Sequence, residues 1–152
     1  MIKAWLVDET TAQLSAVELS DADAGAQYEE LRRVVGGGTD AAYYHRSAVM
    51  HVHGTSSRDG MRPNLAAWAL ACCWRNMELP YLLHGPIVIT GPYNADGATV
   101  GELSTQLTSQ VHTVCATVRE TVDAWQLRPP ASNEAAIAEL LAYTRRDLSA
   151  VN

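Results

Sequence analysis

The sequence predicts one α+β domain, residues 1–152, with a mixed or antiparallel sheet of hairpins, packed helices and two helices at the C-terminus. A length of 152 residues is typical of a single domain with its own core. Hydrophobic residues make up 47% of the chain and charged residues 18%, which indicates a globular protein. Segments with strand patterning come early and in neighbouring pairs, and the longest helical segments come last. That order favours α+β over repeated βαβ units.

Strand patterning marks two early pairs of segments. Residues 2–7 and 13–19 flank a polar four-residue turn, which predicts an opening β-hairpin. Residues 40–46 and 48–53 predict a second strand pair. Because Ser47 alone is a poor turn, one bent strand is the alternative.

A further strand pair is predicted in the second half of the chain. The β-branched run Ile87–Thr90 is typical of a buried strand. The turn sequence at 94–97 then predicts that residues 98–107 return as its partner strand.

Two helices are predicted between the strands. Asp21 or Asp23 suits the N-cap of the first, which ends at the three glycines 36–38. Arg62-Pro63-Asn64 opens the second helix, which runs to about Arg75. Proline suits the first turn of a helix and asparagine is a strong cap.

Two more helices are predicted at the C-terminus. Thr108 or Ser109 caps a long helix that runs to about Trp125, because its apolar residues recur with a period nearer 3.6 than 2. The sequence Arg-Pro-Pro at 128–130 breaks the chain, and the last helix begins at residue 132 or 133.

The charge of the chain excludes one class of function. The net charge is −6 and Lys3 is the only lysine, so general binding to nucleic acid is not expected. No apolar stretch approaches the roughly 20 residues that cross a bilayer, and the N-terminal residues lack the pattern of a signal peptide. The three cysteines, Cys72, Cys73 and Cys115, are a poor disulfide framework and suit a reducing compartment. We therefore expect a cytoplasmic protein without membrane association.

Three short motifs carry a family resemblance: LRRVVGG at Leu31–Gly37, Pro63-Asn64 at a helix start, and GPIVITG at Gly85–Gly91. This pattern resembles an uncharacterised family of small proteins from actinobacteria, firmicutes, their phages and mobile elements. The resemblance covers residues 1–107 and leaves the C-terminal helices, residues 108–152, outside it. It implies a sheet-and-helix core and a phage or mobile-element setting. The family carries no established activity, so the resemblance implies no catalytic residue.

The chain departs from the family pattern at two places. Gly38 stands where the family tends to have an aromatic residue. The loop before Pro63-Asn64 is usually acidic in the family, and here it contains Arg58 and Arg62. This exchange of charge indicates a ligand that is particular to this member.

The helix start beside Arg62 is the candidate binding site. Free backbone N–H groups and the helix dipole favour an anion there, and arginine suits bidentate contact to phosphate or carboxylate. The loop after the buried strand would add a stacking face and an amide. The predicted ligand-binding residues are Arg58, Arg62, Asn64, Tyr93 and Asn94. A capped helix with solvated arginines is the alternative.

These features predict a non-catalytic phage or mobile-element accessory protein that binds an anionic small molecule such as a nucleotide, with an anti-defence role as one form of it. The chain has no nucleophile elbow and no phosphate-loop sequence, so no catalytic residue is predicted. The first alternative is an inhibitor or adaptor that binds a host protein through its C-terminal helices.

The second alternative is a metallohydrolase that uses His51 and His53. Residues two apart on a strand project from one face, so both imidazoles would reach one ion. A catalytic zinc needs a third protein ligand, which no spacing identifies, so neither a metal nor another cofactor is predicted. We also expect a homo-oligomer, most simply a dimer, because a domain of this size would leave the apolar sides of its last two helices partly exposed.

Overall fold

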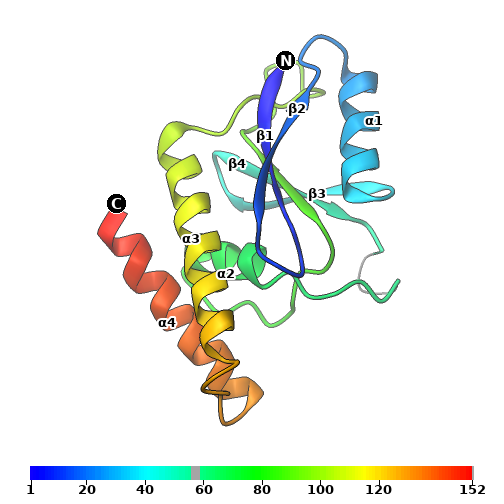
Figure 1. Ribbon diagram of the computed structural model, residues 1–152. Coiled ribbons are helices and arrows are strands. Elements are labelled where there is room, and N and C mark those ends of the chain that lie inside the picture. Colours follow the sequence, from blue (N-terminus) through cyan, green and yellow to red (C-terminus); the bar gives the residue numbers. More distant parts are fainter. Residues whose placement is uncertain (56–58, 152) are drawn as a thin grey trace.

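The computed structural model describes residues 1–55 and 59–151, and it is the predicted α+β fold (Figure 1). Five strands form one sheet in the order β2-β1-β5-β4-β3, and every neighbouring pair is antiparallel. The two predicted hairpins flank the late strand, and a turn at residues 46–47 separates β3 from β4, so they are not one bent strand. The strands are β1 (Ile2–Val7), β2 (Leu14–Leu19), β3 (Thr39–His45), β4 (Ala48–His53) and β5 (Ile87–Thr90).

Helices cover both faces of the sheet (Figure 1). α1 packs against one face, where it buries Leu31 and Val35 against Val88 of the central strand. α2 and α3 lie over the other face, where Ile87 and Ile89 of β5 belong to the same apolar cluster as these helices. α4 packs on α2 and α3. The helices are α1 (Ala24–Val35), α2 (Leu65–Arg75), α3 (Thr105–Ala124) and α4 (Asn133–Val151).

The helix ends follow local capping chemistry. Asp23, rather than Asp21, caps α1, because its side chain accepts a hydrogen bond from the Gly25 N–H. Gly36 ends α1 with a φ of 96°, which glycine adopts without strain. Ser104 caps α3 by accepting from the Leu107 N–H, so the predicted caps Thr108 and Ser109 lie inside the helix.

The prediction of a return strand at 98–107 is wrong. An isolated bridge joins Tyr93 to Val100, and α3 already begins at Thr105. Backbone hydrogen bonds pair the segment with residues 91–94 over only a short stretch, from the Asn94 N–H to the Thr99 carbonyl oxygen and from the Gly101 N–H to that of Pro92. Side chains bind other N–H groups: Asp96 accepts from the N–H of the residues at 98 and 99, and Gln27 on α1 accepts from the Val100 N–H. The predicted boundary at 107/108 consequently falls inside α3.

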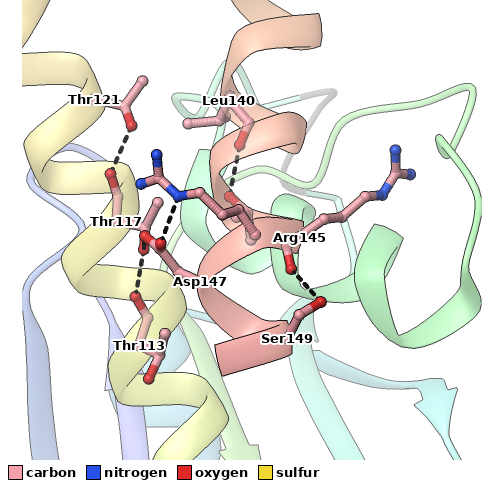
Figure 2. A network of polar contacts seen from close by, with 9 residues as sticks. Thr113, Thr117, Thr121, Leu140, Arg145, Asp147 and Ser149 are labelled. Atoms are coloured by element: carbon pink, nitrogen blue, oxygen red, sulfur yellow. Dashed lines mark hydrogen bonds and ion pairs between the residues drawn. The ribbon is translucent and has the colours of Figure 1, made fainter. Parts of the chain in front are cut away.

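A polar network joins the two C-terminal helices (Figure 2). The hydroxyl of Thr117 on α3 lies 2.7 Å from Oδ2 of Asp147 on α4 and 2.9 Å from the carbonyl oxygen of Thr113. Arg146 donates from Nε to Oδ1 of the same carboxylate at 2.9 Å. These hydrogen bonds hold the pKa of Asp147 below its ordinary value, with the largest effect from Arg146. Asp147 therefore fixes α4 to α3 as a carboxylate.

The apolar sides of these helices are buried within the chain. Val114 and Val118 of α3 pack with Leu140 and Leu148 of α4 in the main core. Among large apolar side chains, α3 leaves none exposed, and α4 exposes only Val151 at its last position. A dimer, or a protein partner on this helical face, was expected because these apolar sides would be partly exposed, and in the structure they are not. The oligomeric state itself stays a prediction. None of the helices in the described residues has the length and apolar character that a membrane crossing requires.

Candidate functional site

Asn64 fixes the start of α2 to the sheet. It is fully buried, and its Oδ1 accepts from the Ala67 N–H at 3.1 Å, which is the predicted cap. Its Nδ2 donates to the carbonyl oxygens of Val7 at 3.1 Å and Gly85 at 2.9 Å. Because the fold uses all of these groups, the side chain of Asn64 holds α2 in place and is not available to a ligand.

Arg62 is held beside this helix start by the backbone. The Gly85 N–H donates to the Arg62 carbonyl oxygen at 2.9 Å, and Pro63 forms a bridge with His84. The positive φ of Gly85, 78°, lets the chain turn into β5 at this point. The side chain of Arg62 is exposed and lines a cleft at the end of the domain.

This cleft, which we call the α2 cleft, has a volume of about 670 Å³. Its walls come from the β1–β2 turn, the first turns of α2 and α4, the segment at 78–82 and the end of α3. Most of the surface is apolar or aromatic. The apolar and aromatic lining residues are Pro63, Leu65, Trp68, Leu79, Pro80, Tyr81, Leu82, Trp125, Ala136 and Ile137.

Three charged side chains line the α2 cleft: Arg62, Glu9 and Glu78. Partial burial, and then the neighbouring carboxylate of Asp8, raise the pKa of Glu9, while Arg62 acts in the opposite direction. The lining of the cleft thus contains one basic and two acidic side chains. The Leu65 and Ala66 N–H groups, in the first turn of α2, have no acceptor within the helix and add partial positive charge beside Arg62.

The structure does not bring the predicted site residues together. Arg62 contacts the chain just before β5, whereas Tyr93 and Asn94 follow the other end of that strand, and four extended residues span roughly 13 Å. Asn94 is used locally, since its Nδ2 donates to the hydroxyl of Thr99 at 2.9 Å. Arg58 lies outside the described residues.

His51 and His53 lie on β4 and are used by local hydrogen bonds. Nε2 of His51 is 2.9 Å from the hydroxyl of Thr90, and burial lowers the pKa of His51 to about 4. Nδ1 of His53 accepts from the Thr55 N–H at 3.1 Å, and its Nε2 is 3.9 Å from the carboxylate of Asp59. Within residues 1–55 and 59–151, no three His, Cys, Asp or Glu side chains gather as a metal-binding group.

Sequence reasoning did not find most of the α2 cleft. Trp68 belongs to the main core and also lines the cleft beside Leu65. Ile137 comes from α4 and Leu79 from the segment after α2, so no single motif contains the wall.

Comparison of the chain with protein families, with curated proteins and with solved structures finds no match.

Proposed function

We propose that the protein is a non-catalytic binding protein whose α2 cleft takes a small molecule with an apolar body and one acidic group. One observation carries this proposal: Arg62 lines a cleft whose walls are mainly apolar and aromatic. Arg62 would hold the acidic group beside the first turn of α2, and the apolar body would lie against Trp68 and Ile137.

The size and the walls of the cleft support a small ligand. Pockets for small molecules commonly have volumes of about 300–1,000 Å³ and apolar walls with a few placed polar groups. The α2 cleft, at about 670 Å³, lies in this range. Asn64 and its three hydrogen bonds fix the helix start, so the polar corner is formed before a ligand arrives.

The charges of the cleft favour a ligand with a single negative charge. Arg62 is accompanied by Glu9 and Glu78, and like charges close to a ligand disfavour its binding. A carboxylate or another monoanion needs one cationic partner, whereas the phosphates of a nucleotide would also meet the two carboxylates. We therefore propose that this cleft binds a small molecule with an apolar body and a single negative charge, in place of the expected nucleotide.

The resemblance supplies the biological setting of the proposal. An accessory protein of a phage or mobile element that captures a small molecule of its host would act in the host cytoplasm and would need no catalytic group. An anti-defence role is one form of that capture.

Two fluorescent probes test the α2 cleft: 8-anilinonaphthalene-1-sulfonate, which is apolar with one negative charge, and the neutral N-phenyl-1-naphthylamine. Arg62→Gln is expected to lower the affinity for the anionic probe by about tenfold or more, which is the cost of one charge-assisted hydrogen bond. The affinity for the neutral probe should not change. Ala136→Trp is expected to fill the cleft and displace both probes. Arg33→Gln, which alters an exposed arginine of α1, is the matched control.

Unfolding curves and circular dichroism of each variant separate lost binding from lost structure. Equal binding of both probes by wild type and Ala136→Trp would place them elsewhere on the protein and overturn the proposal. Equal weakening of both probes by Arg62→Gln would show that Arg62 acts through structure and not through its charge.

A further inference from the structure

A second hollow lies at the edge of the sheet, where the β3–β4 hairpin meets the end of α2. Its volume is about 490 Å³. It is lined by Tyr43, Tyr44, His45, Arg46, Trp74 and Arg75, and we call it the β3 hollow. The side chains of Tyr44 and Tyr81 form a hydrogen bond of 3.0 Å between their hydroxyls, and Tyr81 belongs to the α2 cleft. This pair of tyrosines stands between the two sites.

The β3 hollow is positively charged although the protein carries a net charge of −6. Its lining contains two arginines and no carboxylate. Among the residues that the structure describes, neither Arg46 nor Arg75 forms an ion pair. Burial, and then the charge of Arg46, lower the pKa of His45, so the positive charge of the hollow at neutral pH comes from the two guanidinium groups.

Neither arginine is needed to complete the fold around it. Two of the last four carbonyl groups of α2, those of Cys72 and Cys73, accept from the N–H groups of Asn76 and Met77. In the β3–β4 turn, the N–H of Ser47 donates to Nδ1 of His45 at 3.0 Å. The side chains of Arg46 and Arg75 are both exposed and available to a ligand.

The aromatic walls of the hollow are held in position. The indole N–H of Trp74 donates to Oε1 of Gln110 on α3 at 2.8 Å, and its ring meets His45 edge to face, with centroids 5.3 Å apart. With Nδ1 of His45 accepting a hydrogen bond, the neutral ring carries its proton on Nε2 and has one donor left. Tyr43 is 59% exposed.

We infer that the β3 hollow binds a mononucleotide, with its phosphate between Arg46 and Arg75 and its base stacked on the aromatic wall. Arginine matches phosphate with a planar fork of donors, and two guanidinium groups balance the charge of one phosphate. Stacking of a base on an aromatic side chain does not depend on which base it is, and it adds about 1–3 kcal/mol to the binding free energy. A nucleic-acid strand is disfavoured here because the protein carries a net charge of −6. This inference does not rest on the function proposed for the α2 cleft.

Calorimetric titration at low ionic strength with adenosine 5′-monophosphate, adenosine, inorganic phosphate and decathymidylate tests the β3 hollow. The monophosphate is expected to bind at least about tenfold more tightly than adenosine or phosphate alone, because it uses both parts of the site. Arg46→Gln and Arg75→Gln are each expected to weaken the monophosphate by about tenfold or more without changing the affinity for adenosine. Arg33→Gln is the control that should leave all affinities unchanged, Arg62→Gln distinguishes the β3 hollow from the α2 cleft, and the indole N–H resonance of Trp74 should shift on binding.

Each contrary result overturns the inference in a defined way. No binding of the monophosphate, or equal binding by Arg46→Gln, Arg75→Gln and wild type, removes the site. Weakening of the monophosphate by Arg62→Gln alone moves it to the α2 cleft. Tighter, arginine-dependent binding of decathymidylate than of the monophosphate would make the hollow a nucleic-acid site instead. Failure of the naphthalene probes to bind in the α2 cleft would overturn the function proposed there without changing any result expected for the β3 hollow, so the two proposals fail separately.

Discussion

The side-chain amide of Asn64 donates to the carbonyl oxygen of Val7 at 3.1 Å and so ties the first turn of α2 to the last residue of β1. The same nitrogen bonds the carbonyl oxygen of Gly85, which precedes β5. One buried side chain thus joins a helix start to two neighbouring strands. This arrangement keeps Arg62 and the wall of the α2 cleft at a fixed position relative to the sheet.

Asn64→Ala is expected to lower the free energy of unfolding by about 3 kcal/mol, well above the ~1 kcal/mol of a lost cap, because two buried carbonyl groups lose their donor. Asn64→Asp keeps the oxygen that caps Ala67 but places a carboxylate against the carbonyl groups of Val7 and Gly85. It should therefore destabilise at least as much as Ala at pH 7. Urea unfolding measures both variants. If Asn64→Asp were as stable as wild type, the hydrogen bonds to Val7 and Gly85 would contribute no stability, and Asn64 would act only as a helix cap.

Gly91 is expected to tolerate no side chain. A Cβ at this position would overlap the carbonyl oxygen of Glu102, which belongs to the backbone and cannot move aside. The close approach follows from the hydrogen bond between the Gly91 N–H and the Gly101 carbonyl oxygen, 2.9 Å. Gly91→Ala should cost about 3 kcal/mol in thermal or urea unfolding. Gly38→Ala, where a Cβ meets no atom within 4 Å, is the matched control and should change stability by less than about 0.5 kcal/mol.

Most of the fold was predictable because its signals are local. The two hairpins, the caps at Asp23 and Asn64 and the glycine end of α1 each depend on a few adjacent residues. The return strand at 98–107 was not predictable in this way. Its turn sequence is typical of a hairpin, but the Val100 N–H bonds to Gln27, which is 73 positions earlier in the chain. The backbone pairing stops after one bridge and α3 begins at Thr105, and no local pattern indicates the long-range contact to Gln27.

The candidate sites were less predictable than the fold. The exposed position of Arg62 beside a helix start followed from its neighbours in sequence, but its partners Glu9 and Ile137 come from the opposite ends of the chain. Arg46 and Arg75 were not singled out, since each is an ordinary choice at a turn and at the last turn of a helix. Their meeting at one hollow depends on how β3 packs beside α2.

The three thiols are expected to react slowly in the folded protein. Burial raises the pKa of Cys73 to about 11 and of Cys115 to about 12, and it also raises the pKa of Cys72, so the reactive thiolate is scarce at neutral pH. All three are free in the structure. Ellman's reagent should find three thiols per chain in denaturant without reductant, and native protein should react far more slowly. One thiol or none in denaturant would contradict the expected reduced state.

His51 is expected to make the stability of the protein depend on pH between about 4 and 6.5. The imidazole is 2% exposed and lies 2.9 Å from the hydroxyl of Thr90, and burial lowers its pKa to about 4 from an ordinary value of 6.5. Between these two values the unfolded chain binds a proton that the folded chain does not. Stability is therefore full above pH 6.5 and is lost as the pH falls toward 4.

The shift corresponds to about 3 kcal/mol over the whole window, of which most should be lost by pH 4.5. His51→Gln keeps a polar group near Thr90 but cannot take up the proton. It should be less stable than wild type at pH 7, yet its free energy of unfolding should fall much less between pH 7 and 4.5. Urea unfolding at several pH values compares the two slopes. Parallel slopes would contradict the lowered pKa, because they would mean that His51 takes up its proton in the folded protein above pH 4.5.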